Sequence, residues 1–287
     1  MDTDLHILRA DNPGPLTGAG TNTYLLGRGS VIVIDPGPAL PGHLQAILAA
    51  LHPGDHVAAI LVTHSHLDHS ALARSLADAT GAPVLGCGPA GSGRSPTMKR
   101  LACAGLTGGG EGCDRTYRPD RSLMDGEKLT IGGVTVEVIA TPGHTGCHLA
   151  FATQGRLFAG DTVMGWSTSL VSPPDGDMGA YMATLGKLAG RDWAVIHPGH
   201  GAMVTDAAGR LSDLIAHRQT REAAILAALS NRPATAADLA RLIYTTTPAA
   251  LLPAATRNVL AHLINLSDRT LVTHPDPIRP DSTFTAR

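Results

Sequence analysis

The chain has 287 residues, of which 43% are hydrophobic and 16% are charged, so it can bury a large core and lacks the composition of a disordered protein. Its formal net charge of -2 at pH 7 provides no bulk attraction to nucleic acid or anionic membranes. No run approaches the roughly 18 apolar residues of a membrane span, and the N-terminal MDTDLHILRA is unlike a signal peptide. We therefore expect a cytoplasmic protein with no membrane partner.

The first third of the chain alternates strand-like and helix-like segments separated by Gly and Pro turns. Apolar runs and period-2 patterns predict strands, and apolar residues at helical spacing predict helices. In chain order these segments are a hairpin at 22–27 and 30–37, a helix at 41–54, a strand at 57–63, a helix at 71–79 and a strand at 82–87. This alternation predicts a sheet covered by helices.

Residues 88–118 break the alternation, because they are rich in Gly and Ser and show little periodicity. They predict a long surface loop with one short helix near Thr97–Ala104. Loops of this length are usually either functional or disordered, and the sequence leaves both interpretations open.

Strands resume after this loop, and the character of the chain changes after Thr205. Alternating patterns predict strands at 128–143 and 148–161, followed by a helix at 178–190 and a short strand at 193–201. Beyond Thr205 the sequence predicts a long helix at 211–230, helices near 235–244 and 249–267, and a strand at 270–276. We interpret residues 1–210 as an α/β domain and residues 211–287 as a small winged-helix-like α domain.

The segment VTHSHLDHSA carries four metal-ligand types directly after a predicted buried strand. His64 and His66 are two residues apart on an extended segment, so both rings point to one side. Asp68 and His69 follow a turn and can face a second point nearby. Histidine and carboxylate side chains are ligands that zinc and related metals prefer, so one short segment can serve two metals.

Three further candidates end other strand-like runs, each beside a glycine: His144 in TPGHTGCH, Asp161 in FAGDT and His200 in HPGHG. Together with the first four they are enough for two metals with open positions, and the Asp161 carboxylate can bridge both. Two such metals hold a hydroxide between them and stabilise a leaving oxygen. Isolated histidines elsewhere are expected to be ordinary surface or core residues, namely His43, His52, His56 and His217.

In this order, the motifs THSHLDH, TPGHT, GD and GHG resemble the metallo-β-lactamase superfamily, whose fold is a four-layer αββα sandwich. The resemblance implies two metal sites sharing a bridging carboxylate: the first on His64, His66 and His144, the second on Asp68, His69 and His200, with Asp161 between them. β-Lactamases usually carry cysteine at the position of Asp161. The aspartate indicates the esterase, lactonase, thioesterase and phosphodiesterase branches.

Three other stretches, NPGPLTGAGTNTYLLG, HRQTRE at 217–222 and IY…HLINL, are similar to the β-lactamase-like protein 2 subgroup, which appends a winged-helix-like C-terminal domain. The resemblance covers nearly the whole chain and departs at 88–118. It implies a substrate that is either single-stranded RNA or a small ester, thioester or lactone.

The sequence therefore predicts a hydrolase with two Zn²⁺ ions per chain, with iron or manganese as alternative metals. A hydroxide held by both metals would attack an acyl carbon or a phosphorus, and Asp68 would accept the nucleophile's proton. The alternative is a mononuclear iron persulfide dioxygenase on the same fold, which would use His64, His66, His144 and Asp161. A non-catalytic binding module is a third hypothesis.

Residues around the motifs have supporting roles in this prediction. Asp35, at a strand end, is expected to orient a ligand histidine. His148 is expected to contact substrate, to support a metal ligand, or to be a structural histidine. Asn22 and Thr23 are expected either to line the entrance or to cap a strand.

The four cysteines and the last helix complete the predictions. Cys87, Cys103, Cys113 and Cys147 show no CxxC spacing, and a long chain without a signal peptide favours reduced thiols. The predicted last helix carries Arg257, Asn258 and His262 but little other positive charge, which argues against sequence-specific DNA binding. Its amphipathic pattern predicts packing against the first domain or in a homodimer.

Overall fold

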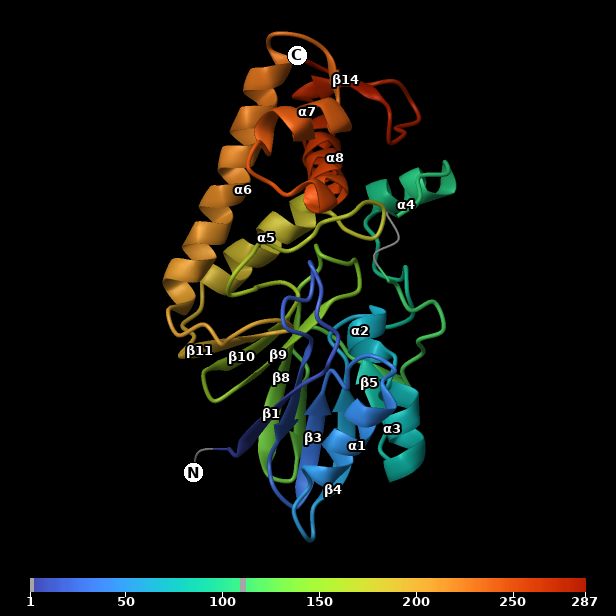
Figure 1. Ribbon diagram of the computed structural model, residues 1–287, viewed down its shortest axis with the longest axis vertical. Coiled ribbons are helices and arrows are strands. Elements are labelled where there is room, and N and C mark those ends of the chain that lie inside the picture. The colour runs from blue at the N-terminus through green and yellow to red at the C-terminus, as the bar shows by residue number, and fades with distance from the viewer. Residues whose placement is uncertain (1–2, 109–111) are drawn as a thin grey trace.

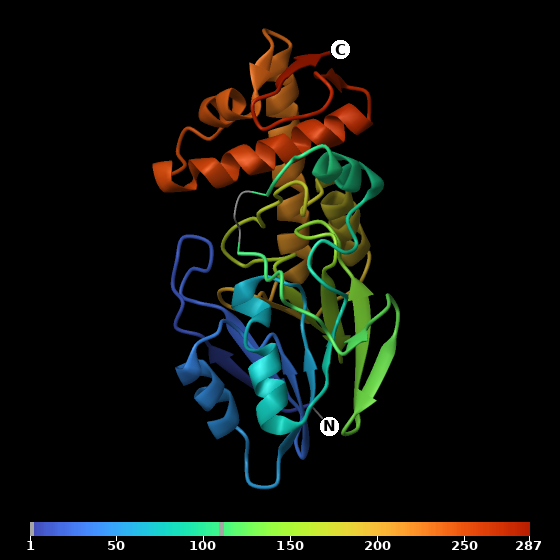
Figure 2. The same cartoon turned by 90° about the vertical axis from the view of Figure 1, so that its right-hand side faces the viewer.

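The computed structural model describes residues 3–108 and 112–287. Two β-sheets lie face to face in the larger part of the molecule, and a smaller helical part caps one end of them (Figures 1 and 2). The first sheet has the strand order β1 (Leu5–Arg9), β2 (Asn22–Leu26), β3 (Ser30–Ile34), β4 (His56–Leu61), β5 (Val84–Gly86) and β6 (Arg121–Ser122). The second has the order β11 (Val195–Pro198), β10 (Arg156–Gly160), β9 (Leu149–Thr153), β8 (Val134–Ala140) and β7 (Lys128–Ile131).

Each sheet packs on both of its faces, because successive side chains of a strand point to opposite faces of the sheet. In β3, Ile32 and Ile34 face the second sheet, while Val31 and Val33 face the helices α1 (Pro41–Ala49) and α3 (Ala73–Thr80). In the second sheet, Phe158 joins the core between the sheets. Its neighbours in β10 pack instead with α5 (Met178–Ala189) and the start of α6 (Ala207–Leu229). The predicted four-layer αββα sandwich is therefore confirmed.

The smaller part is built from helices and a three-stranded sheet. α7 (Ala236–Ile243), the 3-10 helix η1 (Ala249–Leu251) and α8 (Leu252–Asp268) pack with the end of α6. The sheet has the order β12 (Ala234–Thr235), β14 (Thr283–Ala286), β13 (Val272–Thr273). This arrangement matches the predicted winged-helix-like domain. The sequence does not predict β1, β6, β12 and β14, because each has at most five residues and lacks a sustained apolar alternation.

α6 runs through both parts of the molecule, as Figure 1 shows. Leu211 and Leu214 lie in the core against the second sheet, whereas Ile225 and Leu229 lie in the core of the smaller part. The division that we predict between residues 210 and 211 falls inside this helix. The helix itself connects the two cores.

The Gly-rich segment 88–118 is more ordered than a simple surface loop. The predicted short helix is present as α4 (Pro96–Cys103). Met98 and Leu101 of α4 are buried in the core of the smaller part, beside α8 (Figure 2). Residues 109–111 of the segment lie outside the described residues.

The expectation of four reduced thiols is wrong for two of them. Cys87, after β5, forms a disulfide with Cys147, in the loop between β8 and β9, with a Cα–Cα distance of 5.6 Å. The two are 60 residues apart in sequence, so their meeting depends on how the two sheets stack, which cysteine spacing does not encode. Cys103 and Cys113 are free thiols, as expected. Among the described residues, none of the helices is both long enough and apolar enough to cross a membrane.

Candidate metal centre

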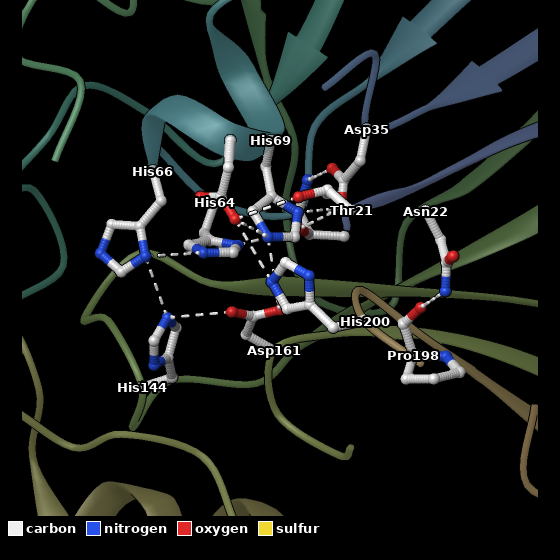
Figure 3. Close-up of polar contacts among 12 residues, drawn as sticks. Thr21, Asn22, Asp35, His64, His66, His69, His144, Asp161, Pro198 and His200 are labelled. Atoms are coloured by element: carbon white, nitrogen blue, oxygen red, sulfur yellow. Dashed lines mark hydrogen bonds and ion pairs between the residues drawn. The ribbon is translucent and has the colours of Figure 1, made fainter. Parts of the chain in front are cut away.

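The seven predicted ligands meet at one end of the two sheets, where strands and the loops that follow them converge (Figure 3). Four of them come from the segment after β4, which continues into the short helix α2 (Leu67–Ser70). The others follow β8, β10 and β11. Their ligand atoms form two groups, within each of which all lie within 4.8 Å of one another: His64, His66, His144 and Asp161 in the first group, and Asp68, His69 and His200 in the second.

The first group has nitrogen atoms at the spacing of ligands on one ion. Nδ1 of His66 lies 3.0 Å from Nε2 of His64 and 3.1 Å from Nε2 of His144. Two nitrogens on a tetrahedral zinc ion with ordinary bond lengths are separated by about 3.3 Å. Burial, followed by the charge of His144, lowers the pKa of His66 to about 3. Burial likewise holds the pKa of His64 well below its usual range. Neutral imidazoles are the form that binds a metal.

The second group is rich in negative charge. Burial opposes protonation of His200, but the nearby carboxylates of Asp161 and Asp68 raise its pKa to about 9. Burial also opposes protonation of His69, but Asp68, Asp161 and Asp35 raise its pKa well above the usual range. The raised pKa values mean that the carboxylates favour positive charge at His69 and His200. A divalent cation would balance the same negative charge of the carboxylates.

Asp161 faces both groups. Its Oδ1 lies 3.3 Å from Nε2 of His69 and 3.4 Å from Nε2 of His200, and its Oδ2 lies 3.7 Å from Nε2 of His144. Both Oδ1 of Asp161 and Nε2 of His69 are buried without a hydrogen-bond partner among the described residues. Buried polar atoms usually have partners, and a cation between these atoms would satisfy both. The residues present therefore fit a pair of metal ions.

Groups behind the ligands fix their orientation. Nδ1 of His69 lies 2.8 Å from Oδ2 of Asp35, which also accepts a hydrogen bond from Oγ1 of Thr63. Nδ1 of His144 donates to the carbonyl oxygen of Leu170 over 2.6 Å. These bonds turn the Nε2 atoms toward the centre. The expected contact between Asp35 and one of the predicted ligand histidines, His69, is therefore present.

The close approach of the chain at β11 requires a glycine. A Cβ atom on Gly199 would lie 2.3 Å from Oδ1 of Asp161 and 2.7 Å from Cε1 of His69. Any larger residue would therefore push the carboxylate or the imidazole out of the centre. This explains the glycine that precedes His200 in the motif.

The lining of the cavity above the centre decides between the alternatives for the neighbouring residues. His148 is 1% exposed, stacks on His64 and is absent from that lining, so its position is structural. Asn22 and Thr23 are buried in β2 and are likewise absent from the lining. The side chain of Asn22 donates to the carbonyl of Pro198 over 3.0 Å, as Figure 3 shows. Oγ1 of Thr23 donates to the carbonyl of Asp35.

A cavity of 470 Å³ opens onto the centre and is lined by both parts of the molecule. Five of the predicted ligands line it: His66, Asp68, His144, Asp161 and His200. The C-terminal part contributes half-buried side chains that the sequence analysis did not assign to the site, His217, Arg221 and Tyr244. His217 was expected to be an ordinary surface or core residue. The one signal that could have indicated its position is the HRQTRE motif, which contains both His217 and Arg221.

The last helix packs against the first domain, as its pattern indicated. Oδ1 of Asn258 accepts a hydrogen bond from the backbone N–H of Val171 over 2.9 Å. Nε of Arg257 donates to Oγ of Ser172 over 2.8 Å. The homodimer and the absence of DNA binding stay predictions.

Comparisons with known proteins agree with this architecture. A family model of the metallo-beta-lactamase superfamily matches residues 16–200, and one of the beta-lactamase associated winged helix domain matches residues 235–277. A beta-lactamase-like protein 2 homolog from Caenorhabditis elegans is 31% identical over 274 residues, which cover 92% of this chain and 84% of the relative. An atrochrysone carboxyl ACP thioesterase from Aspergillus fumigatus is 32% identical over 232 residues, which cover 77% of this chain and 63% of that protein.

A solved structure shares the complete two-part arrangement. A metallo-beta-lactamase family protein from Thermus thermophilus superposes with a TM-score of 0.78 at 27% sequence identity, covering 99% of this chain and 98% of the other. The chain therefore belongs to the metallo-beta-lactamase superfamily and carries a beta-lactamase associated winged helix domain at its C-terminal end.

Proposed function

We propose that this protein is a hydrolase that holds two divalent cations, with zinc as the first candidate, and that it cleaves an ester or thioester bond. The observation that carries the proposal is the pair of donor groups joined by Asp161, whose two oxygens face one group each. His64, His66 and His144 would hold one ion. Asp68, His69 and His200 would hold the other. When bound, the ions supply the Lewis-acid chemistry that activates water for hydrolysis.

Asp68 is the residue best placed to handle a proton. Its carboxylate is 26% exposed and lines the cavity, whereas the side chain of Asp161 is only 7% exposed. Burial acts against ionisation of Asp68, but the charges of His69 and His200 and a hydrogen bond with His200 keep its pKa below the usual range. Asp68 is therefore ionised at neutral pH. In the proposed reaction it accepts a proton from the attacking water. Its Oδ2 is oriented by a hydrogen bond of 3.2 Å from Oγ1 of Thr21.

The cavity favours a small acyl substrate. Its 470 Å³ lie in the range of small-molecule sites, about 300–1,000 Å³. Much of its wall is apolar, including Met164, Trp166 and Leu170. Similarity to a protein named as an acyl-carrier-protein thioesterase supports the same substrate class. Lactones and phosphodiesters, including single-stranded RNA, are the alternatives that an assay must compare.

The test combines metal analysis with a hydrolysis panel. We expect close to two zinc ions per chain in the native protein, and turnover of esters or thioesters. His66→Ala should lower kcat/KM by more than about 100-fold, beyond the effect of removing a group that only supports a ligand. His56→Ala, at the exposed start of β4, is the matched control and should behave as the wild type.

Three outcomes would contradict the proposal. Full activity of His66→Ala would show that His66 does not hold a catalytic metal ion. One iron per chain with oxygen uptake on a persulfide would support the dioxygenase alternative. Cleavage of labelled RNA that weakens as salt rises, with no acyl hydrolysis, would show that the substrate is RNA and not an ester or thioester.

A further inference from the structure

The wall of the cavity that the C-terminal part supplies contains an arginine without a carboxylate partner. Arg221 lies in α6, one helical turn after His217, and both line the cavity. Elsewhere in the same part, Arg241 pairs with Asp238 and Arg269 with Glu222. Across residues 3–108 and 112–287, no carboxylate forms an ion pair with Arg221.

Neutral groups hold the guanidinium of Arg221 in place. Its Nη1 donates to the carbonyl oxygen of Ile243 over 3.2 Å, and its Cζ lies 4.6 Å from the centroid of the Tyr244 ring. Its Nη2 makes no hydrogen bond to any residue that the structure describes. A half-buried cation without a counter-ion is costly, and a guanidinium binds carboxylates and phosphates with paired hydrogen bonds.

His217 supports the same group. Nε of Arg221 donates to Nε2 of His217 over 3.4 Å, so the proton of a neutral imidazole resides on Nδ1. Burial, followed by the charges of Arg218 and Arg221, lowers the pKa of His217 to about 4, so the ring is neutral at pH 7. Nδ1 has no hydrogen-bond partner among the described residues. His217 is therefore uncharged and keeps an unused hydrogen-bond donor, Nδ1, beside Arg221.

Apolar side chains line the same cavity as Arg221 and the candidate metal ligands. Trp166, Met164 and Leu170 come from the first domain, and Leu251 and Ala254 come from the C-terminal part. Trp166 is 50% exposed and presents its apolar ring to the cavity. The wall is suited to a hydrocarbon chain or ring.

We propose that Arg221, oriented by His217 and Tyr244, binds a carboxylate or phosphate at the end of the substrate that is remote from the bond to be cleaved. The substrate class would then be acyl esters or thioesters with an apolar body and a terminal anion. The inference rests on the proposed hydrolase function and adds a second recognition point, supplied by the C-terminal domain.

A matched set of substrates tests this inference. Thioesters whose straight acyl chain ends in a carboxylate, a phosphate or a carboxamide are compared at several chain lengths. The wild type should prefer one of the anionic series over the carboxamide by at least about tenfold in kcat/KM, a factor that corresponds to about 1.4 kcal/mol. Which anion is preferred distinguishes the two sources of charge.

The variants separate binding of the anion from support of the fold. Arg221→Gln should bring the anion-to-carboxamide ratio close to one, mainly through a higher KM for the anionic substrate. Arg221→Lys should retain part of the preference. Arg241→Gln, on the exposed face of α7, is the matched control and should keep the full ratio. Equal losses by Arg221→Gln on both substrate series would show a structural role and overturn the inference.

A binding measurement keeps the inference testable if no thioester is turned over. Titration of the native, metal-loaded protein with hexyl phosphate, followed through tryptophan fluorescence to which Trp166 in the cavity wall contributes, should show saturable binding that Arg221→Gln weakens at least tenfold. Unchanged binding in that variant would overturn the subsite. A wild type that binds the probe but hydrolyses no acyl substrate would contradict the proposed function alone.

Discussion

The imidazole of His69 and the carboxylate of Asp35 form a buried pair in which Nδ1 lies 2.8 Å from Oδ2. The carboxylate also accepts hydrogen bonds from the backbone N–H and the hydroxyl of Thr63, each over 2.8 Å. Asp35 has a backbone φ of 50°, a conformation that aspartate and asparagine tolerate better than most residues. The pair therefore connects the end of β3 to the metal centre.

Replacing Asp35 by asparagine should weaken metal binding without straining the backbone. The variant removes the negative charge that supports His69, so affinity for one zinc ion should fall by about 10–100-fold. Competition with a chromophoric chelator measures this zinc affinity. Asp78→Asn, on the exposed face of α3, is the control. Unchanged zinc affinity in Asp35→Asn would show that the negative charge of Asp35 does not contribute to metal binding.

Asn258 should matter for both stability and metal binding. Its Oδ1 accepts from the backbone N–H of Val171, next to the carbonyl of Leu170 that holds His144. Asn258→Leu leaves this N–H and a donor of Arg218 unpaired, which should lower the free energy of unfolding by about 1–3 kcal/mol. Chemical denaturation and zinc affinity are the measurements.

The matched variant Asn258→Asp keeps an acceptor at the same place and should stay near the wild type in both assays. If the aspartate variant lost as much zinc affinity as the leucine variant, the hydrogen bond to Val171 would not be the cause.

Reduction of the Cys87–Cys147 disulfide should destabilise the protein. The bond closes a loop of 60 residues in sequence, and chain entropy predicts a loss of up to about 4 kcal/mol when a loop of this size is opened. The Cys87→Ser/Cys147→Ser double variant should unfold at lower denaturant concentration. Cys103→Ser, at an exposed free thiol, should change little. Peptide mapping without reductant must find the cross-linked pair, or the disulfide is absent.

His262 should make the protein sensitive to acid. It is 1% exposed, and burial followed by the charges of Arg218 and His217 lowers its pKa to about 3. An unfolded histidine titrates near 6.5, so the unfolded chain binds more protons between about pH 6.5 and 3, and stability falls as pH falls through this window. Above the window the contribution is complete.

His262→Leu should remove this part of the pH dependence. Between pH 7 and 4.5 its unfolding free energy should fall less than that of the wild type, by on the order of 2 kcal/mol. Denaturant titrations at the two pH values give the difference. His56→Gln should follow the wild type. A parallel fall in His262→Leu would show that this imidazole is not the group responsible.

The layers and the clustering of the candidate ligands could be predicted because their signals are local. Ile32 and Val33 point to opposite faces by strand geometry alone, and both faces are buried. The histidines after β4 stand within one short segment, and the others recur at strand ends with a glycine beside them.

The disulfide and the far wall of the cavity could not be predicted in this way. Cys87 and Cys147 meet only because the two sheets stack. Arg221 and Asp68 line the same cavity because α6 and α8 pack over the ends of the strands, a tertiary arrangement that periodicity does not contain. Asp35 could be predicted only in part. A carboxylate at a strand end suggests that it supports a ligand histidine, but only the fold identifies His69 as its partner.

The continuous helix α6 has a mechanical consequence. Its 23 residues extend about 35 Å, and its two halves are buried in different cores. A continuous helix anchored in both cores resists hinge motion between the two parts of the molecule, so we expect the distance between Arg221 and the histidine cluster to vary little. A substrate bound at both of these points would then be selected by the length of its chain.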